Sequence, residues 1–154
     1  MDLVDGLDAT YDVAFASTGV LCWLPDIDRF AAVVRKLLNP GGFFYLHDGH
    51  PFRGMLEEAE NGERVVRHDY FCGGAEEYDT FTDYTEGNLE FPAKSYEWHW
   101  TLGDVVTAFC RQGMRIEFLH EHPQYFYSGY TAYDVVENRR ELFPCTFSLK
   151  AAAG

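Results

Sequence analysis

The first fifty residues alternate between buried strands and one amphipathic helix. Residues 11–17 form a short apolar run that ends in small residues, which predicts a buried strand leading into a loop. Apolar positions recur at helical spacing over residues 25–38, with acidic residues in the first turn and basic residues in the last. Residues 43–47 predict a second buried strand after a Pro-Gly-Gly turn. This order is a βαβ unit, which favours an α/β fold with a parallel sheet.

A different pattern follows over residues 51–100, which are acidic and aromatic. The stretches 64–72 and 78–84 are β-like and flank Gly73-Gly74, which predicts a hairpin. Alternation of aromatic and polar side chains over residues 96–100 predicts another strand. We therefore expect residues 51–100 to form a β-rich insertion or lid.

The last third of the chain predicts one helix and two strands. Thr101 and Asp104 have capping-box spacing before an apolar helical pattern that Gly113 closes. Residues 114–123 alternate between apolar and charged side chains and predict a half-buried strand. Residues 143–150 predict the last strand, and the tail after them carries no pattern.

Composition limits the class of protein. A chain of 154 residues with 47% hydrophobic residues fits one domain, spanning residues 1–154. Its formal net charge of −13 disfavours nucleic-acid and anionic membrane partners. No apolar run reaches the roughly 18–20 residues of a membrane span, and the N-terminus is not a signal peptide. Four cysteines without a C-x-x-C pair predict reduced core thiols, and the expected location is cytoplasmic.

Several blocks, in order along the chain, resemble class I, Rossmann-like S-adenosylmethionine-dependent methyltransferases. Those that resemble the fourth strand, the next helix and the fifth strand are Tyr-Asp-Val at 11–13, Ser-Thr-Gly-Val-Leu at 17–21, Trp-Leu-Pro-Asp at 23–26 and Leu-Leu-Asn-Pro-Gly-Gly-Phe at 37–43. Those that resemble the later helix, the sixth strand and the closing antiparallel strand are Tyr-Glu-Trp-His-Trp-Thr-Leu-Gly at 96–103, Gly-Met-Arg-Ile-Glu-Phe-Leu-His-Glu-His-Pro at 113–123 and residues 143–150.

The resemblance implies a partial Rossmann-like methyltransferase sheet, from the fourth strand onward, with an antiparallel last strand and a β-rich insertion. The family binds its cofactor at a Gly-rich turn after the first strand, and this sequence contains no Gly-x-Gly. The expected chain is thus a truncated, C-terminal portion of such an enzyme. The implied function is methyl transfer from S-adenosyl-L-methionine to a small-molecule substrate.

The same resemblance assigns site residues. It places Ser17, Thr18 and Gly19 beside the cofactor and Trp23 near it, although these residues also fit a plain strand-to-helix connection. Because an imidazole titrates near neutrality, His50 is a candidate catalytic base. The alternative is that His50 shapes a turn with the proline that follows it.

The segment before the last predicted helix supplies the remaining candidates. Tyr96 and Trp98 are candidates for contact with the substrate, and His99 is a second catalytic candidate. Aromatic residues at period two are more often core residues, whereas His99 points to the opposite side of the strand. The expected site then lies between two groups of residues. One group is Ser17 to Gly19 with Trp23, and the other is Tyr96, Trp98 and His99.

Two further hypotheses concern metals and partners. His47 and His50 together with residues 120–122 could supply metal ligands from adjacent strand ends, but isolated strand-end histidines are commoner, so no metal is predicted. The strand at 11–17 would be an apolar sheet edge, which predicts pairing into a homodimer. The alternative function is therefore a non-catalytic binding or assembly module that dimerises through this edge strand.

Overall fold

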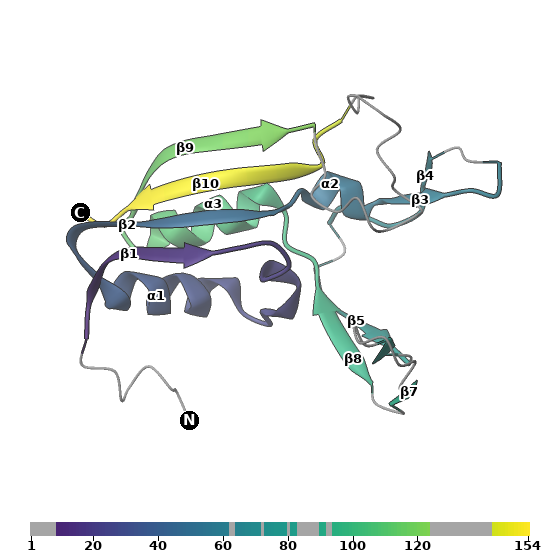
Figure 1. Cartoon of the computed structure of the whole chain (residues 1–154), viewed down its shortest axis with the longest axis horizontal. Helices are drawn as coiled ribbons and strands as arrows, with labels where there is room; N and C mark the ends of the chain where they lie inside the picture. Colours follow the sequence, from purple (N-terminus) through teal and green to yellow (C-terminus); the bar gives the residue numbers. More distant parts are fainter. Residues whose placement is uncertain are drawn as a thin grey trace.

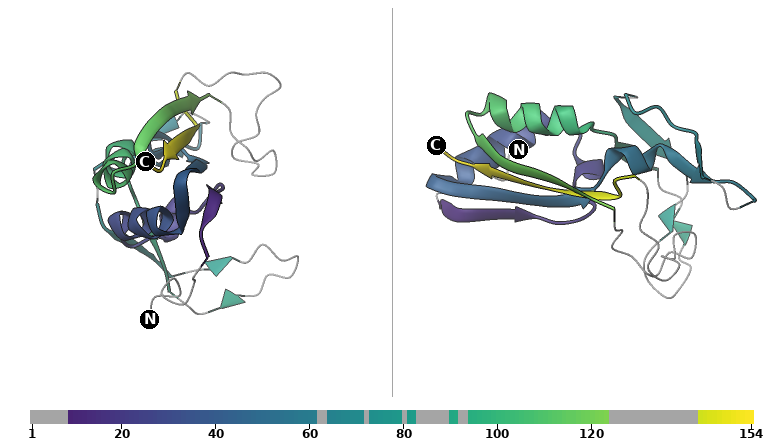
Figure 2. Two further views of the ribbon diagram at one scale, coloured as in Figure 1. Left: turned by 90° about the vertical axis from the view of Figure 1, so that its left-hand side faces the viewer. Right: turned by 90° about the horizontal axis from the view of Figure 1, so that it is seen from above.

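A mixed four-stranded sheet with two helices on one face forms the centre of the fold (Figures 1 and 2). The computed structural model describes residues 9–61, 64–71, 73–79, 81–82, 90–91, 94–123 and 143–154. The strands lie in the order β1-β2-β10-β9, with the bounds β1 Tyr11–Ala16, β2 Leu38–Gly49, β9 Arg115–His122 and β10 Thr146–Ala152. β1 runs parallel to β2, whereas β10 is antiparallel to both β2 and β9. The predicted α/β class and the antiparallel last strand are confirmed.

Both long helices begin where the sequence predicts. α1 (Ile27–Leu37) starts after Asp26, whose carboxylate accepts a hydrogen bond from the Arg29 amide at 2.9 Å. α3 (Leu102–Arg111) starts with the predicted capping box, in which Thr101 and Asp104 each accept from the other's backbone amide. The two helices pack against each other and lie on the same face of the sheet (Figure 2).

The Pro-Gly-Gly segment is part of a strand, not the turn that the sequence predicts. β2 already begins at Leu38, and its first residues pair with the end of the chain: the Gly41 amide donates to the Ala153 carbonyl and the Ala153 amide donates to the Gly42 carbonyl. Gly41 has a φ of +79°, and a Cβ on Gly42 would lie 2.9 Å from the Asp12 carbonyl oxygen. The glycines therefore allow a bulged strand to pass close to β1.

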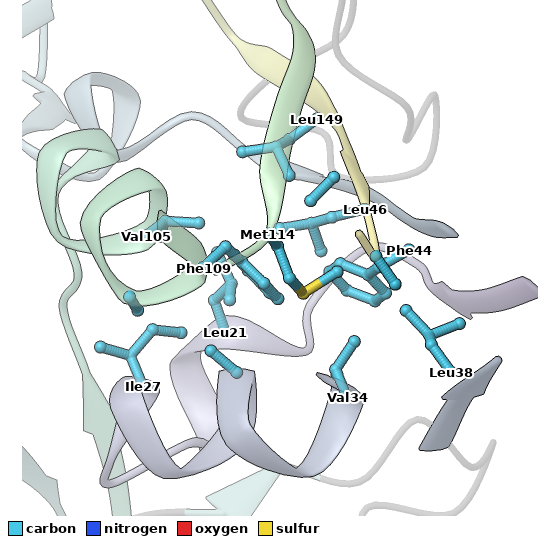
Figure 3. Packing of buried hydrophobic residues seen from close by; sticks show 14 of the residues in the cluster. Leu21, Ile27, Val34, Leu38, Phe44, Leu46, Val105, Phe109, Met114 and Leu149 are labelled. Carbon is cyan, nitrogen blue, oxygen red and sulfur yellow. The ribbon is translucent and has the colours of Figure 1, made fainter. Parts of the chain in front are cut away.

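The core lies between the sheet and the two helices (Figure 3). Phe44 of β2 and Phe109 of α3 are fully buried and stack with their ring centroids 4.9 Å apart. Phe30 of α1 meets both rings edge-on, at 5.8 and 6.2 Å. The C-terminal tail, which carried no pattern, also contributes, since Ala151 and Ala153 are buried in this cluster.

Short elements fill the segment between β2 and α3. They are α2 Pro51–Gly54, β3 Leu56–Glu58, β4 Arg64–Val66, β5 Ala75–Tyr78, β6 Phe81–Thr82, β7 Glu90–Phe91 and β8 Ser95–Trp98. Several of these elements are short strands, but the predicted hairpin across Gly73-Gly74 is wrong, because β4 pairs with β3 and β5 pairs with β8. Cross-strand contacts favour the second pairing: the Tyr96 hydroxyl donates to the opposite Glu77 at 2.9 Å.

The cysteines are only in part the core residues that the sequence predicts. Cys145 is buried, Cys22 is half-buried and Cys110 is exposed. Cys72 lies outside the described residues. None of the helices in the described segments is long and apolar enough to cross a membrane.

Candidate functional site

A pocket of about 260 Å³ lies where β1 and β2 end. Its lining comes from the loop after β1 with the 3-10 helix η2 (Leu21–Trp23), the end of β2 with α2, the turn after β4, and the end of β8 with the two residues that follow it. Thr18, Gly19, His50, Trp98 and His99, all predicted as site residues, line this one pocket. Segments far apart in the sequence thus meet at the carboxyl ends of two parallel strands, where open α/β sheets bind ligands.

Asp48, near the end of β2, holds the loop after β1 in place. Its buried carboxylate accepts backbone hydrogen bonds from Gly19 at 2.7 Å, Val20 at 3.1 Å and Leu21 at 3.0 Å. A fourth bond comes from the Gly49 amide at 2.7 Å. Gly19 has a φ of +85°, a backbone conformation that is strained for a residue with a side chain. One carboxylate therefore fixes the conformation of one wall of the pocket.

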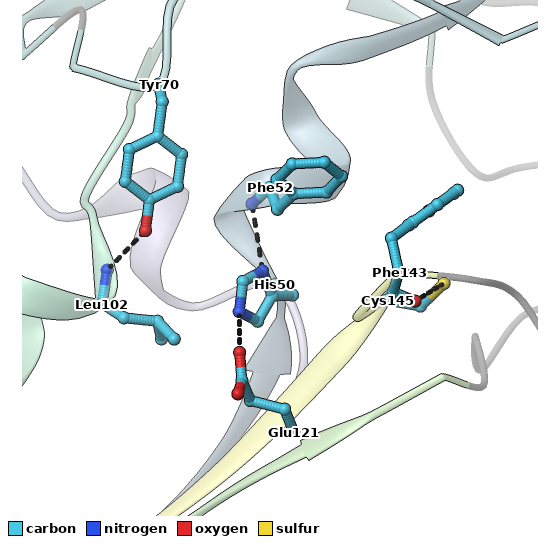
Figure 4. Close-up of polar contacts among 7 residues, drawn as sticks. All are labelled: His50, Phe52, Tyr70, Leu102, Glu121, Phe143 and Cys145. Carbon is cyan, nitrogen blue, oxygen red and sulfur yellow. Dashed lines mark hydrogen bonds and ion pairs between the residues drawn. The ribbon is translucent and has the colours of Figure 1, made fainter.

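His50 is buried, and both of its ring nitrogens are engaged (Figure 4). Nδ1 accepts the Phe52 amide at 3.0 Å and so caps α2, which leaves Nε2 to donate to the Glu121 carboxylate of β9 at 2.9 Å. Burial lowers the pKa of His50, although the hydrogen bond to Glu121 acts in the opposite direction. The neutral imidazole therefore links α2, at the pocket wall, to β9 of the sheet.

We expect this pKa to make stability depend on pH. Because burial disfavours the charged ring, the unfolded chain binds a proton more readily than the folded chain, so the free energy of unfolding should fall as the pH drops below about 6.5. His50→Asn keeps an α2 cap and removes the titrating group. Urea unfolding between pH 7.5 and 5.5 should show a shallower decline in this variant.

Part of that decline should persist in His50→Asn. Burial and the neighbouring His122 also lower the pKa of His47, and that group still titrates in the variant. Equal declines in the wild type and in His50→Asn would contradict the neutral, engaged imidazole described above.

His99 forms the other carboxylate–imidazole pair of the pocket. Its Nε2 lies 2.8 Å from Glu76 Oε2, and the His99 side chain is half-buried at the pocket wall. The hydrogen bond from His99, followed by one from Tyr78, lowers the pKa of Glu76 and keeps it ionised. Within the described part of the chain, Nδ1 of His99 makes no hydrogen bond. Because His99 lines the pocket, this nitrogen is its candidate contact with a ligand.

Aromatic side chains form part of the wall, and two of them are held by contacts with the backbone. The Trp100 indole donates to the Leu24 carbonyl at 2.9 Å. The Tyr70 hydroxyl accepts the Leu102 amide at 3.4 Å (Figure 4). Trp98 completes this wall beside His99.

Three predicted site residues lie outside the pocket lining. Ser17 belongs to the same loop as Thr18 and Gly19, and Trp23 ends η2, but both are exposed, Trp23 at 49%. Tyr96 is 41% exposed on β8 and donates to Glu77. Sequence reasoning missed Asp48 as a site residue, although an Asp-Gly pair at a strand end was a usable signal.

The residues of the metal hypothesis lie on two faces of the sheet. His47, His120 and His122 line a groove on the face opposite the helices, whereas Glu121 reaches His50 on the helix side. Among the described residues, no group of three or more histidine, cysteine, aspartate or glutamate side chains could hold a metal ion.

Comparison with known proteins shows which solved structures have a similar fold. No protein-family model matches the sequence, and no curated protein matches it. A Listeria monocytogenes protein assigned as an S-adenosylmethionine-dependent methyltransferase aligns over 98% of this chain with 16% identity and a TM-score of 0.67. An S-adenosylmethionine-dependent methyltransferase from Mesorhizobium loti aligns over 97% of it with 24% identity and a TM-score of 0.64. The chain has the fold of these methyltransferases.

A further solved structure with this methyltransferase fold contains the cofactor. The glycopeptide N-methyltransferase MtfA in complex with S-adenosyl-L-methionine matches over 96% of this chain, with 17% identity and a TM-score of 0.52. The chain spans 66% of the length of the Listeria and Mesorhizobium structures and 56% of MtfA. It thus corresponds to less than two thirds of each of these methyltransferases.

Proposed function

We propose that this chain takes part in methyl transfer from S-adenosyl-L-methionine to a small molecule. The observation that carries the proposal is the position of the pocket, at the carboxyl ends of β1 and β2 in a sheet with the methyltransferase fold. The loops at these two strand ends bring backbone and side-chain groups close together. Open α/β sheets bind ligands at this position. The fixed loop after β1 supplies a preformed wall.

The residues that line the pocket are of chemical types that suit the cofactor. Its sulfonium is a cation, and the pocket offers the aromatic side chains of Tyr70, Trp98 and Trp100 together with the carboxylate of Asp69. The pocket volume of about 260 Å³ lies just below the ~300–1,000 Å³ of most small-molecule sites. In this proposal the cofactor side is the loop after β1, where Thr18 and Gly19 line the pocket, while Ser17 and Trp23 flank them outside its lining.

The acceptor side is β8 together with the residues that follow it. S-adenosyl-L-methionine, when bound, supplies an activated methyl group, so the protein has mainly to align the acceptor. His99 accepts the acceptor's proton at Nδ1, while Nε2–H remains hydrogen-bonded to Glu76. Trp98 contacts the acceptor, and Tyr96 does so only if the acceptor extends along β8. His50 positions α2, since both of its nitrogens are already engaged.

Thermal unfolding with S-adenosylhomocysteine tests the proposal. A ligand at about 100 times its dissociation constant stabilises a protein by roughly 2.7 kcal/mol, which raises the unfolding midpoint by several degrees. We expect this shift in the wild type. Thr18→Arg, which puts a long cationic side chain at the pocket lining, should lose the shift. Thr107→Arg, on the exposed side of α3, is the matched control and should keep it.

The absence of a shift in a cooperatively unfolding wild type would overturn the proposal. The non-catalytic binding or assembly module would then be the better account of this fold. A shift of equal size in Thr18→Arg would place the ligand somewhere other than this pocket.

A further inference from the structure

His99, the base of the proposed acceptor side, is held by residues outside the pocket lining. Its partner Glu76 belongs to β5, and the two side chains meet at 2.8 Å between Nε2 and Oε2. The Glu76 carboxylate also accepts a hydrogen bond from Tyr78, two residues further along β5. Tyr78, Glu76 and His99 therefore form a chain of hydrogen bonds that ends at the pocket wall.

The pairing of β5 with β8 sets this geometry (Figure 1). Glu76 lies directly opposite Glu97, and side chains two positions apart on a strand point to the same face. Tyr78 therefore shares a face with Glu76, and His99 continues the face of Glu97 just beyond the end of β8. Diagonal neighbours across a ladder are within reach of a long side chain such as glutamate. The strand register thus places the carboxylate beside the imidazole.

Glu76 determines which ring nitrogen of His99 carries the proton. An ionised carboxylate only accepts hydrogen bonds, and a neutral imidazole has one donor and one acceptor nitrogen. The hydrogen bonds from His99 and Tyr78 lower the pKa of Glu76, so the carboxylate is ionised at neutral pH. Burial and the bond to Glu76 raise the pKa of Tyr78, so its hydroxyl remains a donor. Nε2 of His99 then holds the proton, and Nδ1 keeps a lone pair.

We propose that Glu76 and Tyr78 are positioning residues that keep the lone pair of His99 on Nδ1, the nitrogen that accepts the acceptor's proton. When that proton arrives, both ring nitrogens are protonated, and the adjacent Glu76 carboxylate stabilises the imidazolium. The inference rests on the proposed function for the source of the proton. The tautomer of His99 in the free protein does not depend on that function.

Nitrogen-15 NMR of the ligand-free full chain measures the tautomer, because protonated and unprotonated ring nitrogens give separate signals. The His99 signals are those that disappear in His99→Gln. In the wild type we expect the Nε2–H form to exceed the Nδ1–H form at least about tenfold, as a hydrogen bond to a charged group implies. Equal populations, or an excess of the Nδ1–H form, would overturn the inference.

Glu76→Gln should lower this ratio at least about fivefold. The glutamine has one oxygen, for which Tyr78 and His99 compete, and its NH₂ group only donates, which favours a proton on Nδ1. Glu77→Gln is the matched control, since Glu77 accepts a hydrogen bond from Tyr96 on the other face of β5, and it should leave the ratio unchanged. A wild-type ratio in Glu76→Gln would overturn the inference.

A second substitution separates positioning from general support of the β5–β8 pair. When Tyr78→Phe is added to Glu76→Gln, the glutamine oxygen no longer accepts the tyrosine hydroxyl and can accept Nε2–H. The double variant should therefore recover most of the wild-type ratio. If these contacts only held β5 against β8, the loss of a second contact would lower the ratio further. A double variant no better than Glu76→Gln would overturn the role of Tyr78.

The NMR measurement is independent of cofactor binding, so the two proposals can fail separately. The expected tautomer ratio without a thermal shift from S-adenosylhomocysteine would contradict the proposed function and leave the hydrogen-bond chain supported. A thermal shift without the expected ratio would contradict the positioning role of Glu76 and leave cofactor binding supported.

Discussion

Replacing Asp48 with asparagine is expected to lower the free energy of unfolding by about 2–3 kcal/mol. The carboxylate is buried and accepts four backbone amides, two on each oxygen. An asparagine has one oxygen, so two of the four amides would face its NH₂ group instead of an acceptor. Because each kcal/mol moves the midpoint of a domain this size by roughly 2–4 °C, calorimetry would detect the change.

Asp26→Asn is the matched control for this variant. Asp26 also accepts a backbone amide, but it is exposed, accepts one bond and occupies a helix N-cap at which asparagine is equally favourable. We expect a change within about 0.5 kcal/mol. If Asp48→Asn were as stable as Asp26→Asn, the loop after β1 would not depend on the carboxylate.

Truncating Phe109 to alanine should destabilise the fold most, by about 3–5 kcal/mol. Its ring is fully buried on α3 and contacts Phe44 and Phe30, so its removal leaves a cavity between the sheet and both helices. α3 begins directly after the pocket residues Trp98–Trp100, so loss of its packing should loosen that wall as well. Chemical unfolding followed by circular dichroism measures the effect.

Phe71→Ala removes an equal side chain from the surface. Phe71 is 78% exposed and contacts Tyr70 edge-to-face at 5.0 Å, so the expected cost is about 1 kcal/mol or less. Similar costs for the two variants would mean that Phe109 is not part of a close-packed core.

Local signals explain how much of the fold the sequence could predict. The helix caps at Asp26 and Thr101, the charge pattern of α1 and the apolar run of β1 are short-range features, and each element begins at or within two residues of its expected position. The entry into β2 was wrong because its partner, Ala153, is distant in sequence, and a pairing of that kind overrides the turn preference of Pro-Gly-Gly. The hairpin at Gly73-Gly74 was wrong for the same reason.

The candidate site was predictable only in part. Resemblance pointed to Thr18, Gly19, His50 and His99, which the fold brings to one pocket. It could not show that the nitrogens of His50 are both engaged, since the Glu121 contact joins two strands whose register the sequence does not give. Asp48 was overlooked because its four partners become neighbours only when β1 and β2 pair.

The position of β10 has a consequence for the folding of the chain during synthesis. β10 lies between β2 and β9, yet residues 146–152 are made after both of them. Until they leave the ribosome, β2 and β9 have no common neighbour, and Phe44 and Leu46 lack their cross-strand partners Ala151 and Leu149. Contacts of such long sequence separation slow folding and prolong the exposure of apolar surface. The nascent chain should therefore need chaperone protection until its last strand has emerged.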